Sequence, residues 1–445
     1  MLVTTVKPPA ARCYYSPRSI PERVFAAGVA CASVAARRRR TSPAAMALTL
    51  ARALAVHWLV RSAQLEWAHA PLSLAWDDAA AQLAQPESRF GRFAVGDDEL
   101  SLHWLEVPSS TAESATRPLV HCNHGFGASA LSWRPCMRGL ADALGARVAV
   151  AHDAPAFGLT QRPRGSLGAY TLRANAALTT ELVSRVGARA PNGGGARAPP
   201  GFAGHSMGAH SAIQAALDAC DAPDAGPVLL VLVAPAILSI TEKPERALAG
   251  SRAAGPRAAA RPWARVARLV PERASAAAGR ALARLASVPL RRLVFGRGFW
   301  ERGLAMAWHA PRGRDDFERM ARDYALPSRV RGWEDGMLRF VLARGREGIA
   351  AGSARLVSLA RERIQQRRLR VLIVQGARDR ILPPANALAL RDALGGDTAL
   401  VCGAEAAIVA GGDPLHFGDC GHVPHEEQPE RFARAVRAWA AAGGS

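Results

Sequence analysis

The feature that most constrains the fold of this chain is an alternation of short apolar runs with longer helical patterns, which begins near residue 89. The run Val228–Val233 reads Val-Leu-Leu-Val-Leu-Val, a pattern typical of a strand that is buried on both faces. Strands that alternate with helices predict a mostly parallel sheet with helices on both faces. We therefore predict an α/β fold for this part of the chain.

The expected elements follow one another in a regular order, and the first two strands form a hairpin around Gly96-Asp97-Asp98. The predicted strands are Arg89–Val95, Leu100–Val107, Pro118–Cys122, Arg147–Ala151, Gly201–Ala203, Val228–Val233, Arg370–Val374 and Pro414–Gly418. The predicted helices are Ser129–Leu144, Ala174–Val186, Met207–Ala219, Ala385–Leu394 and Pro429–Ala441. A Gly/Pro/Ala loop is expected at Asn192–Pro200.

After Pro235 the alternation stops, and an Arg/Ala/Leu-rich helical pattern with several prolines takes its place. We predict that residues 236–369 form a helical cap above the carboxyl ends of the strands. The core would then consist of two parts, residues 66–235 and 370–445. One domain with a large insertion can use most of the 445 residues, so the length does not require a second domain.

Residues 1–65 carry ten basic side chains and one acidic one, Glu22. This Ser-, Ala- and Arg-rich composition is typical of an organellar transit peptide, and we expect plastid targeting, with the mitochondrion as an alternative. The apolar stretch Val24–Ala36 is too short to span a membrane but suits a secretory signal or a weak anchor. A disordered tail is the remaining alternative. Ala45–Val60 is predicted to be an amphipathic helix on the domain or on a membrane surface.

The formal net charge of +20 is concentrated in the leader and in residues 236–370, which carry 29 basic side chains against 12 acidic ones. Two interpretations remain open for the second region, namely arginines on solvated helix faces or peripheral contact with an anionic membrane. No nucleic-acid-binding motif accompanies the charge, so nucleic acid is not expected as a partner. The seven cysteines are odd in number and include no CxxC pair, so neither a disulfide framework nor a metal site is predicted.

The segment Gly204-His205-Ser206-Met207-Gly208 lies between a predicted strand and a predicted helix. A GxSxG pattern in this context allows a sharp turn that lifts the serine oxygen above the sheet, because the flanking residues are small. Gly204 and Gly208 are the residues that permit the turn. Ser206 is therefore the candidate nucleophile.

A serine hydroxyl is a weak nucleophile and needs a base within hydrogen-bond reach, which an acid in turn orients. His422 lies in Gly421-His422-Val423-Pro424, just before the last predicted helix, and is the candidate base. Asp379 follows the strand Arg370–Val374 after a short loop and is the candidate acid.

Two other histidines compete with His422. His416 falls inside the predicted last strand, where it would belong to the core, and His425 is expected to start the last helix. Asp413 and Asp419 lie too close to the base loop to replace Asp379 without changing the usual order of the three residues.

An oxyanion hole needs two main-chain donors that point at the developing negative charge. We predict the amide of Met207, directly after the nucleophile, and the amide of Phe126 in the turn His124-Gly125-Phe126-Gly127. Gly125 and Gly127 permit the sharp turn.

Together with Asp153–Gly158, these motifs resemble the α/β-hydrolase superfamily, in its branch of esterases, lipases and ring-cleavage product hydrolases with His-Gly at the oxyanion turn. The resemblance covers about residues 89–235 and 370–441, and residues 152–163 are also similar to plastid members of plants and algae. It implies the α/β-hydrolase fold and the order serine, acid, histidine. The chain departs from many relatives at Ala154-Pro155-Ala156, where they carry a charged residue or Gly.

The resemblance implies a serine hydrolase that cleaves an ester or thioester of a hydrophobic small molecule or lipid through an acyl-enzyme, without cofactor or metal. The expected cap tryptophans favour such a substrate unless they form the cap's own core; they are Trp263, Trp300, Trp308 and Trp333. The alternatives are a C–C bond hydrolase, perhydrolase or lyase with the same triad, and a non-catalytic hydrolase-like receptor or scaffold. Proteins of the last class usually lack a triad residue, whereas this chain has all three.

Overall fold

A computed structural model describes residues 74–189, 198–221, 226–237, 294, 298–310, 313–347, 349–395, 398–404, 407–410 and 413–442. All of them belong to one compact unit, Ser73–Ser445. The predicted leader, the helix at Ala45–Val60, most of the loop at Asn192–Pro200, Trp263 and residues 238–293 of the predicted cap lie outside the described residues.

The centre of the structure is an eight-stranded sheet with the order β1-β2-β4-β3-β5-β6-β7-β8. The strands are β1 Ser88–Val95, β2 Asp98–Pro108, β3 Val120–Asn123, β4 Val148–His152, β5 Gly201–His205, β6 Val228–Val233, β7 Leu369–Val374 and β8 Ala399–Val401. β2 pairs antiparallel with β1 and β4, and every other neighbouring pair is parallel. The predicted mostly parallel sheet is confirmed.

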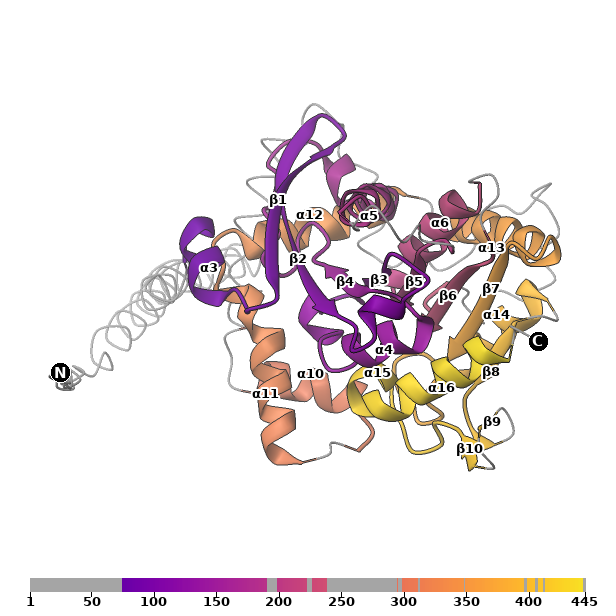
Figure 1. The fold of residues 1–445 in the computed structure, drawn as a ribbon. Helices are drawn as coiled ribbons and strands as arrows, with labels where there is room; N and C mark the ends of the chain where they lie inside the picture. The colour runs from indigo at the N-terminus through magenta and orange to yellow at the C-terminus, as the bar shows by residue number, and fades with distance from the viewer. Residues whose placement is uncertain are drawn as a thin grey trace, which may run out of the picture. The chain divides into compact units, whose positions relative to one another are not determined.

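Helices cover both faces of this sheet (Figure 1). The α-helices are α3 Trp76–Leu83, α4 Met137–Leu144, α5 Leu172–Gly187, α6 Gly208–Cys220, α10 Phe299–Ala307, α11 Arg314–Ala325, α12 Trp333–Arg346, α13 Ile349–Gln365, α14 Pro384–Leu394, α15 Pro424–Glu427 and α16 Pro429–Ala441. Short 3-10 turns are η2 Ala112–Ser114, η3 Ala130–Ser132, η4 Leu167–Tyr170 and η5 Leu326–Arg329. α4 packs with α16 on one face, while α6 packs with α5 and α13 on the other.

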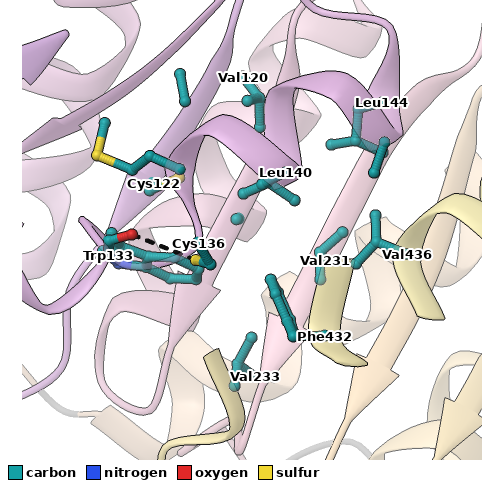
Figure 2. Packing of buried hydrophobic residues seen from close by; sticks show 14 of the residues in the cluster. Val120, Cys122, Trp133, Cys136, Leu140, Leu144, Val231, Val233, Phe432 and Val436 are labelled. Carbon is teal, nitrogen blue, oxygen red and sulfur yellow. Dashed lines mark hydrogen bonds between the residues drawn. The ribbon is translucent and has the colours of Figure 1, made fainter. Parts of the chain in front are cut away.

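The alternation of side chains along β6 explains how one apolar strand serves two cores. Val231 and Val233 pack toward α4 and α16, whereas Leu230 and Leu232 pack toward α6 and α13. Figure 2 shows the first of these cores, where side chains from β3, α4, β6 and α16 pack together with Trp133. Because every residue of β6 is buried, this strand anchors both helical layers to the sheet.

The structure corrects the prediction of the last strand. The segment predicted at Pro414–Gly418 forms only β10 Asp413–Leu415, which pairs with β9 Ile408–Ala410 in a separate two-stranded ladder. The eighth strand of the main sheet is instead β8, which is three residues long. Such a short strand carries no readable periodicity. His416 therefore lies after β10 and outside the sheet.

Two helical predictions also need correction. The helix predicted at Ser129–Leu144 consists of η3 and α4, separated by a turn that contains Pro135, which has no N–H to continue a helix. The predicted cap extends too far, because α13 belongs to the helical layer of the sheet. Leu356, Val357, Ala360 and Ile364 of α13 are buried in the same core as α6 and β7. Among the described residues, α10, α11, η5 and α12 remain as the insertion.

Candidate active site

Ser206 lies on the turn between β5 and α6, with a positive φ of 50°. A non-glycine residue in this left-handed region is strained and persists only where its surroundings determine it. The Ser206 N–H donates to Val233 O at 2.8 Å, and its carbonyl accepts from Ala236 N at 3.0 Å. The last residue of β6 and Ala236, shortly after it, therefore hold the turn on both sides.

The glycines that flank Ser206 lie where no side chain fits. A Cβ on Gly208 would lie 2.4 Å from Asn123 O and 2.5 Å from His124 O, both main-chain atoms at the end of β3. A Cβ on Gly204 would lie 2.7 Å from the Cα of Ala209 in α6. These contacts explain the GxSxG spacing, since α6 starts against the end of β3 only if both positions lack a side chain.

The two amides predicted for the oxyanion hole are without a protein acceptor among the described residues. The Phe126 N–H shares a peptide unit with Gly125 O, which accepts from His124 Nδ1 at 2.8 Å. In a trans peptide the N–H points away from the carbonyl, so the bond to His124 directs the Phe126 N–H to the opposite side. Met207 precedes the first residue of α6, where helix N–H groups have no intrahelical partner.

His124 is held in one tautomer. Its Nε2 accepts from Ala154 N at 3.1 Å, so the proton lies on Nδ1 and is donated to Gly125 O. Burial lowers the pKa of His124, which keeps the ring neutral. His124 belongs to the predicted turn, but its position in the sequence gives no sign of this role.

Asp153, directly after β4, joins β2, the turn η3 and the loop at Leu159. Its buried carboxylate accepts from His103 Nδ1 at 2.6 Å and from the amides of Ala130 and Leu159, both at 2.7 Å. Burial alone would raise the pKa of Asp153, but His103 and these hydrogen bonds outweigh it and hold the pKa well below its usual range.

Asp379 and His422 meet, although they lie far apart in sequence. Asp379 Oδ2 accepts from His422 Nδ1 at 2.7 Å, so Nε2 is the ring nitrogen that remains available as a base. Asp379 also accepts from Gln375 Nε2 at 2.8 Å and from the amides of Ile381 and Leu382. The described residues show no hydrogen bond between Ser206 Oγ and His422. Catalytic contacts of this kind often tighten only when substrate is bound.

His205 links the elbow to the base loop. Its Nε2–H donates to the main-chain oxygen of His422 at 3.1 Å, and the two rings lie 4.8 Å apart between centroids. A Cβ on Gly125 would lie 2.6 Å from His205 Nδ1 and 3.2 Å from the Cβ of Ser206. The elbow, the oxyanion turn and the base loop therefore lie against one another at His205.

The competing histidines lie in different surroundings. His425 is buried in α15, with its ring 4.3 Å from that of Trp133, and burial lowers its pKa to about 3. His416 Nδ1 accepts from the amide of Gly418. Neither ring forms a described hydrogen bond to Asp379, which leaves His422 as the partner of this carboxylate.

Apolar side chains surround the oxyanion turn. The Phe126 side chain is 58% exposed, and its ring lies 5.9 Å from those of Phe157 and Phe340, the latter from α12. The insertion tryptophans Trp308 and Trp333 are buried among their neighbours and form part of packed cores. The exposed aromatic side chain at the turn is thus Phe126, which packs against the buried rings of Phe157 and Phe340.

The part of the chain that the structure describes contains no group of three or more His, Cys, Asp and Glu side chains placed to hold a metal ion. Within the same residues, no helix has both the length and the apolar character that a membrane span requires.

The sequence model of the alpha/beta hydrolase family matches residues 119–435, more than half of the chain. The chain belongs to the α/β-hydrolase family. No curated protein matches it in sequence.

Solved structures of similar fold include a thermophilic esterase from Thermogutta terrifontis, 18% identical, with a TM-score of 0.46 over 80% of this chain and 98% of that one. Another is the 2-hydroxy-6-oxo-6-phenylhexa-2,4-dienoate hydrolase of Rhodococcus sp. strain RHA1, 20% identical, with a TM-score of 0.45 over 78% of this chain and 96% of that one. At these identities, the substrates named for those proteins are properties of those proteins alone.

Proposed function

We propose that this α/β-hydrolase is a serine hydrolase that cleaves an ester or thioester of a hydrophobic small molecule or lipid through an acyl-enzyme. The observation that carries the proposal is the strained turn at Ser206. Ser206 directly precedes Met207, and it packs against the turn that carries the Phe126 amide; neither amide has a protein acceptor among the described residues. Its neighbour His205 donates to the main-chain oxygen of His422, which is hydrogen-bonded to Asp379.

The proposed reaction proceeds in two steps. Ser206 Oγ attacks the carbonyl carbon while His422 Nε2 takes its proton, and Asp379 stabilises the imidazolium that forms. The amides of Phe126 and Met207 stabilise the oxyanion, and collapse releases the alcohol or thiol with the proton from His422. Water then attacks the acyl-enzyme by the same route and regenerates Ser206.

The apolar surroundings support a hydrophobic substrate. Three exposed, large apolar side chains belong to residues of the site or to residues next to them in sequence. Phe126 carries one proposed oxyanion amide, Ile381 donates its N–H to Asp379, and Met306 precedes Ala307, whose oxygen accepts from His422 N. Exposed apolar side chains next to site residues favour an apolar ligand over a charged one.

Labelling with a fluorophosphonate, followed by peptide mapping, tests the proposal. We expect the label on Ser206, whereas Ser211 in the buried face of α6 stays unmodified. Ser206→Ala should lose activity on p-nitrophenyl esters by a factor on the order of 10⁴ or more with little change in melting temperature, and the exposed Ser110→Ala serves as control. A label on another serine, or activity that survives in Ser206→Ala, contradicts the assignment.

The C–C bond hydrolase, perhydrolase and lyase alternatives use the same residues, and p-nitrophenyl esters of increasing chain length separate them from an esterase. Contact with an anionic membrane stays a prediction. Residues 238–293, outside the described ones, carry 12 basic side chains against three acidic ones, so much of the surplus charge lies there. Plastid targeting by residues 1–65 likewise stays a prediction.

A further inference from the structure

The base loop contacts the helical insertion through main-chain atoms. The His422 N–H donates to the oxygen of Ala307, the last residue of α10, at 2.6 Å. A Cβ on Gly421 would lie 2.2 Å from the same oxygen and 2.8 Å from His309 N. The two segments therefore touch without intervening side chains, and the position of His422 depends on where residues 307–310 lie.

The carboxylate of Glu427 joins these two segments. The residue is 1% exposed, and its oxygens accept from Gly421 N at 2.9 Å, Ala310 N at 2.9 Å and His309 N at 3.1 Å. One of these donors directly precedes His422, and the other two belong to the insertion. Charge-assisted hydrogen bonds to main-chain amides are short and directional, so they hold both segments to one side chain.

The neighbouring carboxyl group, Glu426, makes a different kind of contact. It is also buried, but its oxygens accept from side chains of the insertion, the Tyr324 hydroxyl at 2.8 Å and the Trp308 indole at 3.2 Å. None of its described hydrogen bonds reaches the main chain of the base loop. The carboxyl group of Glu426 thus contacts the insertion, whereas that of Glu427 contacts both the insertion and the loop that carries the base.

We propose that Glu427 is a positioning residue that couples the helical insertion to the catalytic base His422. The proposal rests on the role of His422 in the proposed function. The base must hold its Nε2 within about 3 Å of the serine oxygen to accept its proton. Glu427 contributes to this placement by fixing Gly421 against residues 307–310, so a displacement of the insertion would move the imidazole.

The test compares Glu427→Gln with Glu426→Gln in the full-length protein. An amide at position 427 keeps one oxygen but turns its NH₂ group toward main-chain N–H donors, which opposes the observed arrangement. We expect kcat on p-nitrophenyl butyrate to fall about tenfold or more, with KM changed less than about threefold, and labelling of Ser206 by a fluorophosphonate to slow in parallel. Glu426→Gln should leave kcat within about twofold, because a neutral acceptor and donor satisfies Tyr324 and Trp308.

The inference is overturned if a folded Glu427→Gln protein has the same kcat as the wild type. It is also overturned if Glu427→Gln and Glu426→Gln lose kcat equally, because any contact with the insertion would then have the same effect. If Glu427→Gln does not fold, Glu427→Asp gives the same comparison, because it keeps the acceptors but is one methylene shorter. Failure of the wild type to label at Ser206 would instead overturn the proposed function, so the two failures are distinct.

Discussion

The nucleophile elbow and the base loop of this α/β-hydrolase are held by contacts of different range. Ser206 is positioned by residues within a few places of it and by the neighbouring strands, through close main-chain packing that excludes side chains at Gly204 and Gly208. His422 is positioned by Asp379, 43 residues away, and by His205, 217 residues away. Glu427, which holds the residue before His422, reaches His309 across 118 residues.

The elbow is thus held by close steric packing, whereas the base loop is held by hydrogen bonds. The elbow depends on the absence of atoms, so its requirement appears in the sequence as glycines at fixed spacing. The base loop depends on directional hydrogen bonds between distant segments, so its geometry responds to single acceptor-to-donor changes. Substitutions of the elbow glycines should therefore lower stability, whereas substitutions of the hydrogen-bonding residues around the base loop should lower turnover.

The largest effect is expected for Asp379→Asn. One oxygen of Asp379 accepts from the amide of Ile381, and the other accepts from His422 and Gln375. An amide has one oxygen only, so its NH₂ group must face donors and the imidazole loses its orientation. We expect kcat on p-nitrophenyl esters to fall by a factor of about 10⁴ while the melting temperature changes little. Asp392→Asn, at an exposed position of α14, is the control. A loss in Asp379→Asn smaller than about tenfold would contradict the expected role of Asp379.

A smaller effect is expected for Glu426, which should change how the free energy of unfolding depends on pH. Burial raises the pKa of Glu426 from its ordinary 4.5 to about 8, while its bonds to Tyr324 and Trp308 oppose the rise, and Asp323 and Glu427 add to it. Between pH 4.5 and 8 the folded protein therefore holds a proton that the unfolded chain has lost. Stability on this account falls as pH rises through that interval and levels off above it.

Glu426→Gln should remove this slope. One pH unit in the window is worth about 1.4 kcal/mol, so the difference in unfolding free energy between variant and wild type should grow to a few kcal/mol near pH 8. His425 Nε2 lies 3.9 Å from Glu426, but its lowered pKa keeps it neutral throughout the window. Urea unfolding at pH 5, 6.5 and 8 measures the difference, and a constant offset across these values would contradict the assignment.

The smallest effect is expected for substitution of a glycine at the closely packed elbow. Gly208→Ala places a Cβ 2.4 Å from Asn123 O, so we expect a loss of about 1–3 kcal/mol in unfolding free energy and slower labelling of Ser206. Gly303→Ala in α10 meets no atom within 4 Å and should stabilise the protein by up to about 1 kcal/mol. Urea unfolding measures both, and equal stability of the two variants would show that the elbow tolerates a side chain.

The sequence by itself determined the fold class and much of the elbow. Strand and helix periodicities predicted a mostly parallel sheet between helical layers, and the structure confirms it. The turn at Ser206 lies where the glycine spacing predicted it, between β5 and α6. The periodicities are readable because they repeat along consecutive residues. The elbow is readable because close packing excludes side chains at Gly204 and Gly208, which leaves a fixed glycine spacing in the sequence.

Only the tertiary structure decided where the insertion ends and what holds the base. α13 shows helical periodicity in either setting, so its place beside α6 and α14 could not be read from the sequence. β8 is too short to show a pattern. Glu427, His124 and Asp153 act through hydrogen bonds to segments brought near by folding, and a single sequence holds no signal of such partners because spacing along the chain does not encode proximity between distant segments.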